Sequence, residues 1–165
     1  MIIILEGFDE SGKSTLANKL SERIGFNVSH PGKRPFDVDD ALRMADIQSG
    51  LFHFAKDVDL IIDRVTCISS NCYTWRSTDL FSRHQTQIID SKHIKVIHCK
   101  YNGAQLTVSE HDRDGSVGFA RKNKEQIIER YSQLFAEIPH CEYDYTNPNS
   151  FQDVAKYIGF DKFDK

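Results

Sequence analysis

One short stretch limits what this chain can fold into more than any other. Residues 7–14, GFDESGKS, follow the pattern G-x-x-x-x-G-K-[ST] and lie between the apolar run IIILE at 2–6 and apolar residues at helical spacing. Gly7 and Gly12 allow the backbone to turn so that successive N–H groups point inward, toward phosphate oxygens. We therefore expect a buried strand, a phosphate-binding loop (the 7–14 loop) and a helix that begins at Lys13.

The polar side chains of the 7–14 loop have separate predicted tasks. Lys13 is expected to reach the β and γ phosphates of a nucleotide, and Ser14 to offer its hydroxyl to Mg²⁺. Asp9 and Glu10 would repel phosphate if their carboxylates pointed into the loop, so we expect both to point out of it. One of these acids can then accept a hydrogen bond from a sugar hydroxyl.

Strand-like and helix-like stretches alternate along the whole chain, which predicts an α/β fold with a mostly parallel sheet of about five strands. The expected strands are 2–6, 26–30, 58–63, 94–99 and 142–146. The expected helices are 13–24, 37–55, 77–90, 127–138 and 151–158. Residues 103–121 carry charges and glycines with few apolar side chains, and predict an exposed, mobile segment. Ligands of such sheets bind beyond the carboxyl ends of the strands, which places the chemistry after residues 2–6 and at Asp63.

Length and composition exclude several classes of protein. The 165 residues suffice for a single domain, 1–165, and the net charge of −3 argues against a nucleic-acid binder that acts through bulk electrostatics. The first apolar run, Met1–Leu5, is too short for a signal peptide or a membrane span, so we expect a cytoplasmic protein. The four cysteines and seven histidines show no metal-ligand spacing, so we expect reduced thiols and no histidine metal site.

Three stretches resemble the thymidylate kinase branch of the P-loop nucleoside monophosphate kinases, particularly the short versions found in bacteriophages. They are ILEGFDESGKST (4–15), DLIIDRVTCISSNCYTW (59–75) and RKNKEQIIERYSQLF (121–135), and the resemblance extends over roughly residues 1–160. It implies a P-loop NTPase fold of three α/β/α layers with a small lid segment at about 106–121. It also implies transfer of the γ-phosphoryl of ATP to a deoxynucleoside monophosphate similar to dTMP, and a homodimer in the host cytoplasm.

The resemblance assigns residues to both substrates. Asp9 stands where the family has an aspartate that accepts a hydrogen bond from the 3′-hydroxyl of the acceptor. Asp63 and Arg64 match the family's Asp-Arg pair, in which the arginine binds the acceptor phosphate and the aspartate orients waters on Mg²⁺. The strand-end position of Asp63 is also that of a Walker-B acid. The implied acceptor residues are Asp9, Arg34, Arg64, Ser69, Asn71 and Tyr73. The implied ATP-binding residues are Gly7, Glu10, Ser11, Gly12, Lys13, Ser14 and Thr15.

Glu10 departs from the family, which commonly has glycine or arginine at that position. Without an arginine in the loop, positive charge for the transferred phosphoryl group must come from the lid, where Arg113 and Arg121 are the candidates. The expected catalytic residues are therefore Lys13, Asp63, Arg64, Arg113 and Arg121. The expected metal ligands are Ser14 and Asp63, for Mg²⁺.

Several alternatives stay open at this point. Tyr73 can be a base contact or a core residue, and Arg34 a phosphate clamp or a solvated loop residue. Phe52 and Phe54 can stack on a base or pack in the core at helical spacing. The acceptor can also be a nucleoside, a modified nucleotide or a base within DNA. A nucleotide-binding regulatory module without transfer chemistry is the alternative of another class, although the chain has no N-K-x-D motif.

Overall fold

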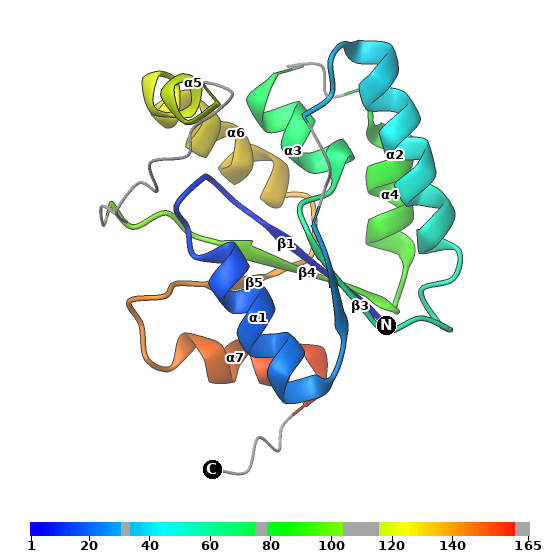
Figure 1. Cartoon of the computed structure of the whole chain (residues 1–165), viewed down its shortest axis with the longest axis vertical. Helices are drawn as coiled ribbons and strands as arrows, with labels where there is room; N and C mark the ends of the chain where they lie inside the picture. The colour runs from blue at the N-terminus through cyan, green and yellow to red at the C-terminus, as the bar shows by residue number, and fades with distance from the viewer. Residues whose placement is uncertain (31–33, 75–78, 104–115, 161–165) are drawn as a thin grey trace.

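The computed structural model describes residues 1–30, 34–74, 79–103 and 116–160. Within them, a sheet of five parallel strands, in the order β2-β3-β1-β4-β5, lies between two layers of helices (Figure 1). The strands are β1 (Ile2–Glu6), β2 (Asn27–Ser29), β3 (Leu60–Asp63), β4 (Ile94–Cys99) and β5 (Cys141–Tyr143). The helices are α1 (Lys13–Ile24), α2 (Val38–Phe52), α3 (Thr66–Tyr73), α4 (Ser82–Asp90), α5 (Ser116–Lys122), α6 (Lys124–Phe135) and α7 (Ser150–Ile158). The predicted three-layer α/β/α fold with a parallel sheet is confirmed.

β1 is the central strand, and its sequence reflects that position. It pairs in parallel with β3 and with β4, so that Leu5 lies opposite Asp63 and Glu6 opposite His98. All five of its residues are buried, because helices cover both faces of the sheet. A strand covered on both faces needs no alternation of polar and apolar residues, which explains the run IIILE.

Two hydrophobic cores hold the layers together. On one face of the sheet, Leu16 and Leu20 of α1 and Ile158 of α7 pack with Ile3 and Leu5 of β1. On the other face, side chains of α2, α3, α4 and α6 pack with the alternate residues of the same strand. Each fully buried leucine or isoleucine stabilises the fold by about 1.5–3 kcal/mol relative to an exposed position.

The predicted elements form, some with the predicted bounds and others with shifted or shorter ends. The strands predicted at 26–30, 58–63 and 142–146 are observed as β2, β3 and β5, and the helix predicted at 37–55 ends at Phe52. The side chain of Asp37 caps this helix by accepting a hydrogen bond from the backbone N–H of Asp40 at 2.8 Å. Phe52 packs in the core, whereas Phe54 is exposed.

Two helices were not expected. Helix α3 occupies a stretch of serine, threonine, cysteine and asparagine, residues with weak helix propensity, and most of its side chains are buried. Helix α5 lies in the segment 103–121, for which no helix was expected. Of the predicted lid at 106–121, only residues 116–121 lie within the described part of the chain, and Arg113 lies outside it.

The structure also bears on the cysteines and on membrane-spanning helices. All four cysteines are free thiols, and three of them are buried, as expected for reduced cysteines. Among the described residues, no helix combines the length and the apolar character that crossing a membrane requires.

Candidate active site

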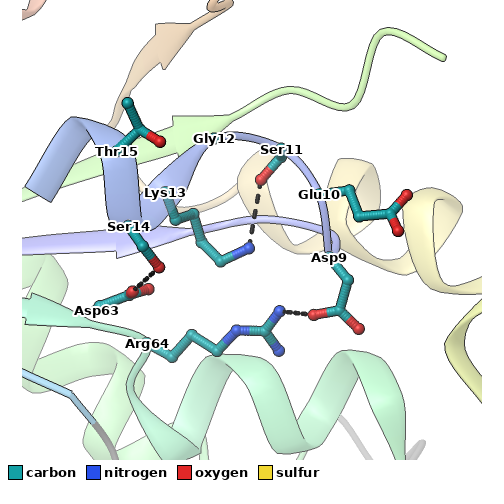
Figure 2. A pocket seen from close by; sticks show the side chains of 9 residues that line it. All are labelled: Asp9, Glu10, Ser11, Gly12, Lys13, Ser14, Thr15, Asp63 and Arg64. Atoms are coloured by element: carbon teal, nitrogen blue, oxygen red, sulfur yellow. Dashed lines mark hydrogen bonds and ion pairs between the residues drawn. The ribbon is translucent and has the colours of Figure 1, made fainter. Parts of the chain in front are cut away.

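A cavity of about 360 Å³ opens at the carboxyl ends of β1 and β3 (Figure 2). These two strands are neighbours in the sheet, so the segments that follow them meet at one edge. The cavity is lined by Asp9, Glu10, Ser11, Gly12, Lys13, Ser14, Thr15, Asp63 and Arg64. Each of these residues was predicted as a site residue, and the structure brings the two groups together from positions about fifty residues apart.

The backbone of the 7–14 loop has no room for a side chain at its first glycine. Gly7 has φ +147°, and a Cβ atom at this position would lie 2.2 Å from the carbonyl oxygen of Cys99 at the end of β4. Such a distance is far below van der Waals contact, and the contacted atom is backbone that cannot move aside easily. Gly7 therefore lets the loop pass directly over the end of β4.

Lys13 lies inside the loop, at the start of α1. Its Nζ donates hydrogen bonds to the carbonyl oxygens of Gly7 at 3.0 Å and Phe8 at 2.7 Å. It also donates to Ser11 Oγ at 3.3 Å (Figure 2). Burial lowers the pKa of Lys13 to about 8, and the positive charge of Arg64 acts in the same direction. The ammonium group is therefore mostly protonated at pH 7 and available to a phosphate.

Ser14 and Asp63 form the second feature of the cavity. Ser14 Oγ donates a hydrogen bond to Asp63 Oδ2 at 2.8 Å (Figure 2). His30 Nδ1 lies 3.3 Å from the same oxygen. A hydroxyl and a carboxylate are the oxygen donors that Mg²⁺ prefers, so this pair fits the predicted metal ligands. His30 was not predicted, although it follows β2, the strand beside β3, and so lies at the same edge of the sheet.

Arg64 is held on the opposite side of the cavity by two partners. Its guanidinium forms an ion pair with Asp9 (Figure 2). It also donates a hydrogen bond to the hydroxyl of Tyr73 at 3.2 Å. The same hydroxyl accepts a hydrogen bond from the backbone N–H of Asp9 at 3.0 Å, and the guanidinium lies over the Tyr73 ring at 4.9 Å. Tyr73 also stacks on Phe8, so it both packs and orients a site residue, and the two alternatives for this residue are not exclusive.

Glu6 was not predicted; its side chain does not line the cavity, but it contacts the backbone directly after Arg64. It ends β1 and is fully buried, and its carboxylate accepts hydrogen bonds from the backbone N–H of Val65 and from the hydroxyl of Tyr131, the latter at 2.9 Å. Burial raises the pKa of Glu6 to about 7, against the opposing effect of Arg64. An acid at the end of an otherwise apolar strand was the available sequence signal.

Glu10 and Arg121 connect the loop to α5. Arg121 Nη2 lies 3.3 Å from Glu10 Oε1, so the carboxylate of Glu10 points away from the inside of the loop as expected and pairs with one of the two predicted lid arginines.

The remaining predicted acceptor residues lie apart from the cavity lining. Arg34 donates to Thr74 Oγ1 at 3.0 Å and lies over the ring of Phe119 at 5.0 Å. Ser69 Oγ donates to the carbonyl oxygen of Val65 at 3.0 Å, one helical turn earlier in α3. Asn71, in the same helix, is buried.

No protein-family model and no curated protein matches this chain. Solved structures do match it over nearly its whole length. YorR from Bacillus subtilis, in complex with phosphorylated GDP, is 22% identical with a TM-score of 0.58, covering 97% of this chain and 94% of YorR.

Two further solved structures also match nearly the whole chain. Thymidylate kinase from Ehrlichia chaffeensis is 16% identical with a TM-score of 0.55, and deoxyadenosine kinase from M. mycoides with bound dATP is 14% identical with a TM-score of 0.55. Each covers 94% of this chain and 97% of the other. At such low identity the likeness establishes the fold alone. This chain therefore has the fold of the P-loop kinases.

Proposed function

We propose that this chain is a nucleotide kinase that transfers the γ-phosphoryl group of ATP to a deoxynucleoside monophosphate, with dTMP as the first candidate. One observation carries the proposal: Arg64 and Asp9 are held together at the cavity that the 7–14 loop lines. A loop suited to a triphosphate thus lies beside a cation and an acid suited to a second nucleotide. The names of the matched structures, which include thymidylate kinase and deoxyadenosine kinase, support the same class of substrate.

The donor side of the proposed site consists of the 7–14 loop and the start of α1. The backbone N–H groups of the loop and the amino end of the helix favour the phosphates of ATP, and Lys13 adds a full positive charge. Ser14 and Asp63 would hold Mg²⁺, Asp63 through waters as the resemblance implies. Mg²⁺, when bound with ATP, neutralises negative charge on the β and γ phosphates.

The acceptor side uses Arg64 and Asp9. Arg64 aligns the phosphate of the acceptor, and Asp9 accepts a hydrogen bond from its 3′-hydroxyl. Because the attacking phosphate oxygen is already ionised, the reaction needs no general base, and the protein contributes positioning and positive charge. Arg121, paired with Glu10 at the rim of the loop, supplies charge to the phosphoryl group in transfer.

An acceptor screen tests the proposal. The protein is incubated with ATP and Mg²⁺ and with each dNMP, nucleosides or single-stranded DNA, and the release of ADP is measured. We expect release that depends on a monophosphate, fastest with dTMP. Release only with a nucleoside or with DNA would reassign the acceptor, and nucleotide binding without acceptor-dependent release would favour the regulatory module.

Lys13→Ala provides the matching test within the protein. We expect turnover to fall at least about 100-fold, because the variant lacks the buried charge beside the phosphates. Lys19→Ala, which changes an exposed lysine of the same helix, should keep the parent's turnover. Thermal unfolding of both variants tests whether the fold persists. Near-normal turnover of Lys13→Ala would refute the assignment.

A further inference from the structure

Three side chains with metal-binding chemistry, none of which lines the cavity, meet at the edge of the sheet. One ligand atom each of His98, His140 and Glu142 lies within 4.8 Å of the other two. His98 is in β4 and Glu142 is its register partner in β5, so both side chains leave the same face of the sheet. His140 immediately precedes β5. The arrangement depends on the pairing of β4 with β5, which explains why the spacing along the sequence did not reveal it.

His140 is oriented as a metal-binding imidazole commonly is. Its Nδ1 lies 2.8 Å from the backbone carbonyl oxygen of Ile138, an atom that can only accept a hydrogen bond. Nδ1 therefore carries the proton, which leaves a lone pair on Nε2. A backbone carbonyl that fixes the tautomer of a histidine in this way is the usual second partner of a metal ligand.

His98 is held in place by aromatic packing. Its ring stacks on Phe135 at a centroid distance of 4.3 Å and lies 6.0 Å from the ring of Tyr131. Within the described parts of the chain, its ring nitrogens have no hydrogen-bond partner.

We infer that His98, His140 and Glu142 bind one divalent transition-metal ion of the zinc class. Two imidazoles and one carboxylate are a ligand set of zinc proteins, with water in the fourth position. Imidazole ligands favour Zn²⁺ and its neighbours over Mg²⁺, which prefers oxygen alone, so this site differs in chemistry from the Ser14–Asp63 pair. Lys100 Nζ, 3.2 Å from Glu142 Oε2, is a half-exposed partner that a metal ion can displace.

The inferred ion would cross-link the outermost strand of the sheet. β5 has three residues and pairs only with β4 among the described strands. A metal ion shared by the two strands binds the folded chain alone, and it stabilises the fold in proportion to its affinity. The inference is independent of the proposed kinase activity.

The experiment uses the full chain without a polyhistidine tag, after treatment with EDTA. Titration calorimetry with Zn²⁺ should show one ion per chain with a dissociation constant below about 10 µM. At a Zn²⁺ concentration of about 100 times this constant, Tm should rise by about 5–10 °C. Co²⁺ as a probe should give the visible absorption of an ion with nitrogen ligands.

Variants locate the ion. Glu142→Gln and His140→Gln change residues outside the core and should each weaken Zn²⁺ binding at least about tenfold. His53→Gln, at an exposed histidine of another surface, should bind as the parent does. His98→Gln is less informative because His98 packs on Phe135.

Three results would overturn the inference. The first is the absence of stoichiometric binding, and the second is parent-like affinity in Glu142→Gln and His140→Gln. The third is loss of binding in Asp63→Asn with retention in Glu142→Gln, which would place the ion at His30 and Asp63 instead.

Discussion

Glu6→Gln should change how the stability of this protein depends on pH. The carboxylate of Glu6 is fully buried, and its pKa is raised from 4.5 to about 7, mainly by the loss of water around it. Glutamine has nearly the same shape. Its amide oxygen can accept the hydrogen bond from Val65 N–H, and its amide nitrogen can donate to the hydroxyl of Tyr131.

The expected size follows from proton binding. Between pH 4.5 and about 7 the folded state keeps the proton on Glu6, whereas the unfolded state has lost it. The free energy of unfolding therefore falls as pH rises through this range, by about 1.4 kcal/mol for each unit of difference in pKa. Over the full difference the ionisation of Glu6 costs about 3 kcal/mol, which is fully present above pH 7 and absent below pH 4.5. Glutamine carries no such cost.

Urea unfolding of both proteins at pH 4, 5, 6, 7 and 8 measures the effect. The stability of Glu6→Gln relative to the parent should rise by about 3 kcal/mol between pH 4 and pH 8. Groups that do not interact with Glu6 contribute equally to both proteins, so the difference reports mainly on Glu6. Glu22→Gln, at an exposed glutamate of α1, should show no such trend.

The reasoning fails if the difference between Glu6→Gln and the parent stays constant over this range. A constant difference would mean that Glu6 has the same pKa in the folded and unfolded states, and that Arg64 compensates fully for its burial. A difference that changes in the opposite direction would mean that the positive charge of Arg64 outweighs the burial of Glu6.

Gly7→Ala should lower the free energy of unfolding by about 2–4 kcal/mol in urea, because the new Cβ would lie 2.2 Å from the Cys99 carbonyl oxygen. Gly50 lies inside α2 with open space around it, so Gly50→Ala should instead raise the free energy of unfolding by about 0.5–1 kcal/mol. Equal changes in stability in Gly7→Ala and Gly50→Ala would disprove the clash. Arg121→Gln should lower kcat at least about tenfold under saturating ATP. Glu10→Gln removes the carboxylate of the same ion pair, and should change the free energy of unfolding by less than about 1 kcal/mol. An unchanged kcat for Arg121→Gln would remove the lid role.

The parts of the fold that follow from local pattern could be predicted from the sequence. Consecutive residues determine the structure of the run at 2–6, the loop at 7–14 and the helix after it. These segments, together with Asp63 and Arg64, supply the lining of the cavity. Helix α3 could not be predicted this way. Its residues have weak helix propensity, so the helix is stabilised by the burial of its side chains against neighbouring helices.

Contacts between distant strands were also beyond the reach of local patterns. His30 approaches Asp63 because β2 lies beside β3, and His98 meets Glu142 because β4 lies beside β5. Both contacts require the strand order, which the alternation of elements does not fix. The expectation that the histidines form no metal site was based on spacing along the chain, and spacing alone does not reveal that His98, His140 and Glu142 lie close together.

The two acids of the 7–14 loop each hold an arginine that comes from elsewhere in the chain. Asp9 pairs with Arg64, which follows β3, and Glu10 pairs with Arg121 of α5. Because both carboxylates lie outside the loop, its inner side is left to Lys13 and to backbone N–H groups. A phosphate that approaches must compete with a carboxylate for each guanidinium, but Arg64 also lies over the Tyr73 ring and can keep its place while it changes partner. The two acids therefore hold arginines beside the 7–14 loop without placing their negative charge on its inner side.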